Sequence, residues 1–127
     1  MPAKLLIVED QADIRRLIRW ALEEDDYEIR EAANGSVGLD QILSWQPDMV
    51  LLDMMMPGGI DGLELCRQVR ASPGTGKTII VMLTAKAASA DQEAARAAGA
   101  DYFLPKPFSP AKLSGLLHAL LKHRQDR

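Results

Sequence analysis

Apolar runs alternate with amphipathic stretches along this chain, and that alternation restricts its possible folds more than any other feature. Three runs are continuously apolar, at residues 5–8, 49–52 and 79–83, as in strands covered on both faces of a sheet. Weaker strands are expected at 27–30 and 102–104. The chain is therefore predicted to be an α/β protein, a (βα)₅ doubly wound parallel sheet with helices on both faces and right-handed crossovers.

The segments between these runs repeat their apolar residues at helical spacing. The first such stripe runs from Ile14 to Leu22 and the last from Leu113 to Leu121, where Ser109 is a predicted cap. The other helices are expected over 37–45, after Asp61-Gly62, and over 90–98, which Gly99 would stop. The helix over 90–98 consists mostly of small residues, so we expect it to be the least firmly anchored.

Composition limits the class of protein. The chain has 127 residues, enough for one domain, which is expected to occupy 1–127. Its net charge of −3 argues against broad electrostatic binding to nucleic acid, and no stretch has the length of a membrane span. The single cysteine, Cys66, allows no internal disulfide, which fits a cytoplasmic setting.

Polar residues follow the predicted strands where each strand ends. Glu9-Asp10 follows the first, Asp53 the third, Thr84 the fourth, and Lys106 comes shortly after the fifth. Each residue alone has an ordinary reading as a loop, turn or cap residue. Because the carboxyl ends of parallel strands meet at one edge of a sheet, we expect all of them to gather there.

The chemistry of this group favours a metal and a phosphoryl group. Three carboxylates in one cleft raise one another's pKa values, so a cation is expected among them. Oxygen ligands without His or Cys suit Mg²⁺. An ammonium and a hydroxyl beside the metal, from Lys106 and Thr84, would bind phosphoryl oxygens, and the Asp53 carboxylate could serve as the nucleophile.

With these motifs the sequence resembles the receiver domain of two-component response regulators, in particular the single-domain, chemotaxis-regulator kind. The resemblance covers about residues 4–121 and implies a flavodoxin-like fold with strand order 2-1-3-4-5. The matching stretches are Leu6-Ile7-Val8-Glu9-Asp10, Leu51-Leu52-Asp53-Met54-Met55-Met56-Pro57, Asp61-Gly62, Met82-Leu83-Thr84-Ala85, Gly99-Ala100-Asp101 and Lys106-Pro107-Phe108.

The resemblance also implies a role for each residue. Asp53 is the expected phosphoacceptor, with Thr84 as the switch hydroxyl and Lys106 as the phosphoryl-binding cation. Phe103 is the expected aromatic that rotates inward with Thr84, and the Lys106-Pro107 bond is expected to be cis. Mg²⁺, for which Mn²⁺ can substitute, is expected on Asp10, Asp53, the backbone carbonyl of Met55 and, largely through water, Glu9.

Partners follow from the same resemblance. The phosphoryl donor would be a histidine kinase or a histidine phosphotransfer protein, and the receiver of the signal a downstream protein or output domain. The signal would be read from the surface of the helix over 90–98, the strand over 102–104 and the last helix. The chain would be a monomer or a weak dimer through that surface, and a regulatory switch that assists its own phosphorylation and dephosphorylation rather than an enzyme.

Departures from the family pattern leave other functions open. Gly58-Gly59-Ile60 makes one loop a residue longer than the commonest spacing, and Met55 and Lys86 stand where side chains flank the phosphoryl group. An aspartyl phosphatase would need a second Asp where Met55 stands. A module that signals by contact alone would not need the five polar side chains, and a flavin protein would need a hydroxyl-rich phosphate loop that the chain lacks.

Overall fold

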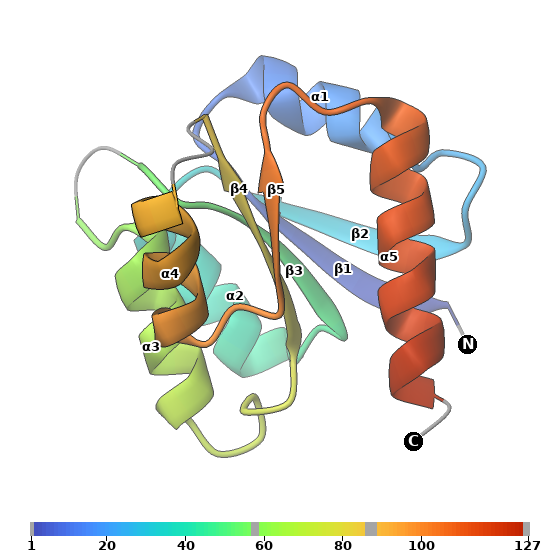
Figure 1. Ribbon diagram of the computed structural model, residues 1–127. Helices are drawn as coiled ribbons and strands as arrows, with labels where there is room; N and C mark the ends of the chain where they lie inside the picture. The colour runs from blue at the N-terminus through green and yellow to red at the C-terminus, as the bar shows by residue number, and fades with distance from the viewer. Residues whose placement is uncertain (1, 57–58, 86–88, 126–127) are drawn as a thin grey trace.

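The computed structural model describes residues 2–56, 59–85 and 89–125, and these form one parallel sheet with helices on both faces (Figure 1). The strands are β1 (Ala3–Val8), β2 (Tyr27–Ala32), β3 (Met49–Asp53), β4 (Ile79–Thr84) and β5 (Tyr102–Pro105). Their order is β2-β1-β3-β4-β5, and all neighbours are parallel. The predicted α/β fold class and strand order are confirmed.

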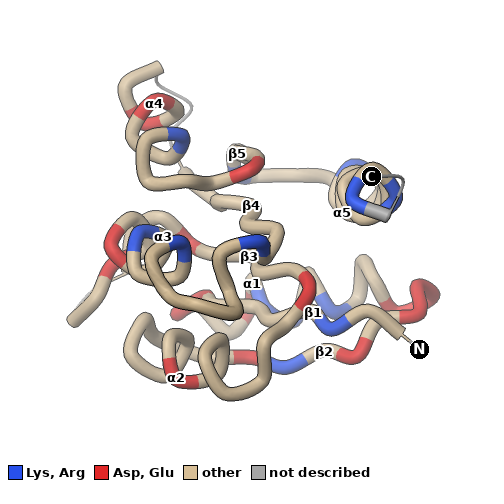
Figure 2. The backbone as a smooth tube through the Cα atoms, turned by 90° about the horizontal axis from the view of Figure 1, so that it is seen from below, with Lys and Arg blue, Asp and Glu red and all other residues tan. Residues whose placement is uncertain are grey.

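Two helices cover one face of the sheet and three cover the other (Figures 1 and 2). The helices are α1 (Ala12–Ala21), α2 (Gly35–Trp45), α3 (Gly62–Ala71), α4 (Ser89–Ala98) and α5 (Pro110–Gln125). Alternate side chains of the central strands supply both core layers: Leu5 and Ile7 pack on the α1 and α5 side, Leu6 and Val8 on the side of α2, α3 and α4. This alternation explains why the central runs are apolar at every position.

Side-chain caps set the starts of several helices. The Asn34 side chain accepts a hydrogen bond of 2.9 Å from the Val37 N–H, and Asp61 accepts one of 2.9 Å from the Glu64 N–H. Ser109 accepts one of 3.1 Å from the Lys112 N–H, as its predicted capping role requires. Because Asn34 is the cap, α2 begins two positions earlier than the predicted start at residue 37.

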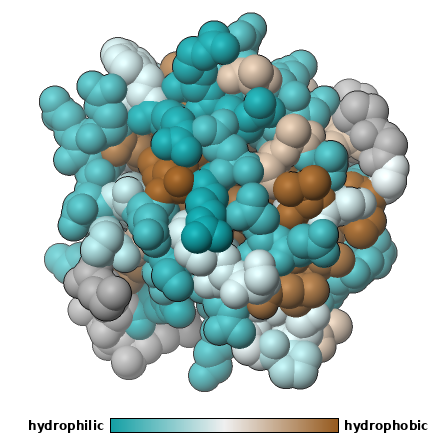
Figure 3. All heavy atoms as spheres, turned by 180° about the vertical axis from the view of Figure 1, so that it is seen from behind, coloured by the Kyte–Doolittle hydropathy of each residue, from teal (hydrophilic) through white to brown (hydrophobic). Residues whose placement is uncertain are grey.

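The predicted buried stripe of α1 is wrong at one position. Ile18 and Leu22 are fully buried, but Leu17 is 38% exposed. Leu17 lines a shallow hollow with Ile14, Pro107 and Phe108. On the side seen in Figure 3, the surface is mostly hydrophilic and its hydrophobic side chains form separate small groups.

Arg70, near the end of α3, fastens the segment between α4 and β5. Its guanidinium donates to the backbone carbonyls of Gly99, Gly76 and Thr78, and it pairs with the Asp101 carboxylate at 2.7 Å. Gly99 has φ +103, a conformation that favours glycine, and ends α4 as predicted. The C-terminal end of α4 is thus tied to α3. Within the described ranges, no helix combines the length and apolar character needed to cross a membrane.

Candidate functional site

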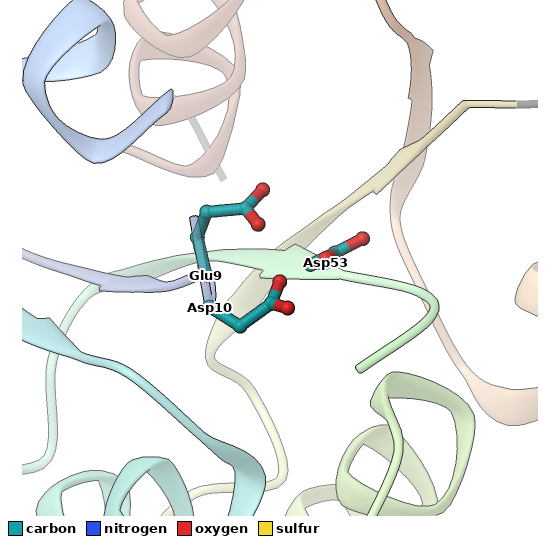
Figure 4. A group of neighbouring side chains, drawn as sticks. All are labelled: Glu9, Asp10 and Asp53. Atoms are coloured by element: carbon teal, nitrogen blue, oxygen red, sulfur yellow. The ribbon is translucent and has the colours of Figure 1, made fainter. Parts of the chain in front are cut away.

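Four strand ends bring the predicted polar residues to one edge of the sheet. Glu9 and Asp10 follow β1, and Asp53 is the last residue of β3. Their carboxylates turn toward the same space (Figure 4), and one oxygen from each lies within 4.8 Å of the others. Thr84 ends β4 beside them, and Lys106 directly follows β5. The sequence-based expectation that these residues gather at one edge is therefore met.

Lys106 already has an anionic partner in this structure. Its Nζ donates to Glu9 Oε1 at 2.7 Å and lies 3.6 Å from Asp53 Oδ1. Glu9 is fully buried, so its charge needs such a partner. Its other carboxylate oxygen accepts from the Gln11 N–H at 3.2 Å, and Arg15 donates to its backbone carbonyl at 2.7 Å. Glu9 is consequently held in place from three sides.

The Asp53 carboxylate is in an electrostatically unfavourable position. Only 5% of the residue is exposed. Burial and then the negative charge of Glu9 raise the pKa of Asp53 to about 7, against the opposing effects of Lys106 and of the Met55 N–H. The Met55 N–H donates to Asp53 Oδ1 at 3.3 Å. An additional positive charge beside Asp53 would relieve this repulsion.

The donor set fits a hard divalent cation. Glu9, Asp10 and Asp53 offer only carboxylate oxygens, and neither His nor Cys belongs to the cluster. Mg²⁺ prefers such ligands and binds through one or two carboxylates while keeping several waters. The Met55 side chain is 73% exposed at the rim, whereas Met54 and Met56 are buried. Met54 and Met56 therefore belong to the hydrophobic core, whereas Met55 contacts solvent beside the carboxylates.

A cavity of about 420 Å³ opens over these residues. Its lining comprises Asp10, Gln11, Asp53, Met54, Met55, Thr84, Ala85, Asp91 and Lys106. Sequence reasoning missed Gln11 and Asp91. The position of Asp91 in the first turn of the helix that follows Thr84 is the one signal that could have indicated it.

Two glycines allow the chain to pass closely behind the site. A Cβ on Gly62 would lie 2.2 Å from the Asp53 carbonyl oxygen, so α3 begins directly against the end of β3. The Gly62 N–H donates to the Met54 carbonyl at 3.2 Å. In the longer loop before it, Gly59 has φ +63, which favours glycine, while Pro57 and Gly58 lie outside the described residues.

The predicted switch residues occupy adjacent strands. Thr84 is 2% exposed, and its carbonyl accepts from the Lys106 N–H at 2.6 Å. Phe103 is half-buried against the core layer beneath α4 and lines a hollow with Ala95 and Arg96. The Lys106-Pro107 peptide bond is cis, the isomer that the family resemblance implies. Lys86 lies outside the described residues.

The fold and the site together define the class of CheY-like signalling domains. These domains have a parallel α/β sheet with acidic residues, a hydroxyl and a lysine at its carboxyl edge. Comparison with known proteins identifies the family. The family model of the response regulator receiver domain matches residues 5–118. The chain belongs to this family, the phosphorylation-dependent switches of two-component systems.

Individual relatives agree with this assignment. The chain is 44% identical to the transcriptional regulatory protein ResD of Bacillus subtilis (strain 168) over 119 residues, 94% of this chain and 48% of that protein. A structure described as a response regulator from Chloroflexus aurantiacus J-10-fl shares 38% identity at a TM-score of 0.90, covering 96% of this chain and 99% of that one. The Vibrio cholerae chemotaxis protein CheY4 shares 31% identity at a TM-score of 0.87, covering 94% and 98%. The chain spans about half the length of the curated relatives it matches.

Proposed function

We propose that this chain is a signalling switch that accepts a phosphoryl group on Asp53 in a Mg²⁺-dependent reaction. The observation that carries the proposal is the position of the Asp53 carboxylate, which lines the cavity beside two other carboxylates and lies 3.6 Å from the Lys106 ammonium. A carboxylate so placed can attack phosphorus, while its neighbours hold the charges that the reaction requires.

The proposed reaction is a transfer between two acceptors. A carboxylate oxygen of Asp53 forms a bond to phosphorus as the bond from phosphorus to the donor nitrogen breaks, and the donor histidine leaves with that electron pair. The raised pKa of Asp53 means that its carboxylate must first lose any proton it holds. Asp10 and Asp53, the backbone carbonyl of Met55 and, through water, Glu9 would hold Mg²⁺ or Mn²⁺. When bound, the ion would offset charge on the phosphoryl oxygens.

Lys106 and Thr84 are the proposed partners of the phosphoryl group. Phosphorylation adds roughly −1.5 to −2 charge and new acceptor oxygens, a figure for phosphorylated hydroxyl residues. The Lys106 ammonium, now shared between Glu9 and Asp53, lies close enough to exchange one anionic partner for another. Thr84 ends the neighbouring strand, and its hydroxyl would move toward the phosphoryl oxygens.

The signal would leave the site through α4, β5 and α5. Phe103 lies on β5 between the site and the hollow beneath α4, so a shift of Thr84 would free space for its ring. The resulting change of this surface is the proposed output, read by a downstream protein or output domain. The same surface is the proposed contact of a weak dimer, should the chain not remain monomeric. We place the reaction in the cytoplasm, with a histidine kinase or a histidine phosphotransfer protein as donor.

Intact mass spectrometry tests the chemistry directly. The chain is incubated with acetyl phosphate and Mg²⁺, and a single adduct of about 80 Da, one phosphoryl group, is expected. Asp53→Asn should show no adduct, and omission of Mg²⁺ should abolish it in the wild type. Asp13→Asn is the matched control, because Asp13 is 94% exposed on α1 and lies outside the cavity; it should be phosphorylated normally.

The test also separates the competing functions. Absence of any adduct with Mg²⁺ binding intact would favour a module that signals by contact alone. An aspartyl phosphatase would instead hydrolyse the donor repeatedly and lose its adduct rapidly. The chain lacks the acid–base carboxylate of such an enzyme, because Met55 stands two residues after Asp53.

A further inference from the structure

Asp91 places a third carboxylate on the cavity wall, on the α4 side. It lies in the first turn of α4 and is partly buried, and it lines the same cavity as Asp53 and Lys106. Among the residues that the structure describes, the charged members of this lining are Asp10, Asp53, Asp91 and Lys106. A donor phosphate that reaches Asp53 therefore passes close to Asp91, whose negative charge would repel it.

Asp91 differs from Asp10 and Asp53 in the positive groups that lie near its carboxylate. Asp10 and Asp53 belong to the cluster that fits a divalent cation, and Lys106 lies beside Asp53. Asp91 is outside that cluster, and no hydrogen bond or ion pair to its side chain occurs among the described residues. Its negative charge also offsets the positive end of the α4 dipole, which would otherwise attract an anion into the cavity.

We propose that Asp91 is a specificity-determining residue that disfavours free, multiply charged phosphodonors at Asp53. This inference rests on the proposed phosphorylation of Asp53. A small dianion entering alone meets the repulsion of Asp91 and makes no contacts outside the cavity that could offset it. A donor histidine on a protein brings binding energy from contacts elsewhere, which can overcome that repulsion. Asp91 thus favours a docked protein donor over small phosphorylated metabolites.

The test compares two donors of different charge on three proteins. Acetyl phosphate is a dianion near neutral pH, and phosphoramidate carries about one negative charge. Initial rates of phosphorylation are measured by intact mass for the wild type, Asp91→Asn and Glu93→Gln at an ionic strength of about 0.01 M and again at about 1 M. Glu93 is the matched control, because it is exposed on the same helix and does not line the cavity. Thermal unfolding verifies that both variants fold.

The expected result follows from Coulomb repulsion in a water-filled cavity. For an assumed separation of about 8 Å between the Asp91 carboxylate and the donor, this repulsion changes a rate roughly twofold per unit of donor charge. Asp91→Asn should react about fourfold faster with acetyl phosphate and about twofold faster with phosphoramidate at low ionic strength. Both gains should nearly vanish at about 1 M salt, where the Debye length is about 3 Å. Glu93→Gln should match the wild type.

Two outcomes would overturn the inference while leaving the proposed function intact. One is equal rates for Asp91→Asn and the wild type. The other is a gain that is the same for both donors or unchanged by salt, since that would mark a structural effect. A wild type that takes no phosphoryl group from either donor would instead overturn the proposed function itself, and this inference with it.

Discussion

Helices α4 and α5 border the same strand, β5, yet they are anchored in different ways (Figure 1). The buried side chains of α4 are those of Ala95 and Ala98, whereas α5 buries Leu113 and Leu117 and packs further leucines partly against the core. A buried leucine contributes about 1.5–3 kcal/mol and each CH₂ about 0.8 kcal/mol. Because α4 buries so much less side-chain area, we expect a shift of α4 to cost less free energy than a shift of α5.

The two ends of α4 also differ from each other. Its C-terminal end is fixed by Arg70, which bonds to the Gly99 carbonyl and to Asp101. Its first turn carries Asp91 into the cavity above Asp53. A change of charge at Asp53 would therefore act on the end of α4 that lies farthest from the Arg70 contacts.

The largest expected effect comes from weakening α5. Leu117→Ala should lower the free energy of unfolding by about 3 kcal/mol, because it leaves a cavity at a fully buried position. Urea denaturation measures this loss. Leu43→Ala is the control: Leu43 is 42% exposed and its truncation should cost less than about 1 kcal/mol. Similar losses for both would contradict the firm anchoring of α5.

Hydrogen exchange compares the helices without any substitution. Amides of α4 should exchange about thirtyfold faster than those of α1 and α5, a difference of about 2 kcal/mol in local opening free energy. Mass spectrometry of peptides from each helix provides the measurement. If α4 is as protected as α1, the small side chains do not weaken its attachment and the comparison fails.

Asp53→Asn measures how much the repulsion among the carboxylates of the site lowers the free energy of unfolding. In metal-free buffer at pH 8 the variant should be more stable than the wild type by about 1–2 kcal/mol, because it removes one of the crowded carboxylates. The pKa of Asp53 is raised to about 7, so the folded wild type binds a proton more tightly than the unfolded chain. Its stability should therefore fall as pH rises from about 4 to about 7, and the advantage of the variant should disappear near pH 4.

Thermal unfolding across this pH range, with Asp13→Asn as the control, measures the effect. The exposed Asp13 should give no such gain. An Asp53→Asn variant that is less stable at pH 8 would argue against a crowded acidic site. Hydrogen exchange of Asp53→Asn can also locate the effect. If only the amides of α4 become better protected than in the wild type, the repulsion acts mainly on α4 and not on α5.

The smallest expected effect separates anchoring from helix propensity. Ala97→Gly in α4 and Ala119→Gly in α5 both replace exposed alanines. Each should lower the free energy of unfolding by about 1 kcal/mol, since the cost comes from the backbone alone. Equal losses in urea denaturation would mean that the two helices differ only in what they bury. A clearly smaller loss in α4 would show that this helix contributes little to global stability.

Much of the fold can be predicted because the signals are local. Continuous apolar runs such as 79–83 indicate strands buried on both faces, and polar residues that follow them must lie at one edge of a parallel sheet. The predicted ends of the strands are therefore sufficient to predict that Asp53, Thr84 and Lys106 lie close together. The cap at Ser109 and the stop at Gly99 depend on neighbours a few positions away, so the sequence predicts them as well.

The remainder depends on contacts that spacing does not encode. Leu17 is exposed although it lies on the apolar stripe of α1, and Met55 is exposed between two buried methionines, so the apolar pattern alone predicts neither exposure. Asp91 lines the cavity although it belongs to no apolar pattern and follows no strand directly, so spacing alone does not predict it. The sequence also does not predict the pairing of Lys106 with Glu9, because its pattern assigns the lysine to a phosphoryl group alone.

The bond between Lys106 and Glu9 joins positions 97 residues apart, and this bears on how the chain is made. A ribosome releases Glu9 and Asp53 long before Lys106, at about 5–20 residues per second. Until the lysine emerges, the Glu9 carboxylate has to remain hydrated, because burying it without a partner would be too costly. The acidic edge of the sheet can therefore close only after the segment that carries Lys106 has been synthesised, so the site forms later than the strands that carry Glu9 and Asp53.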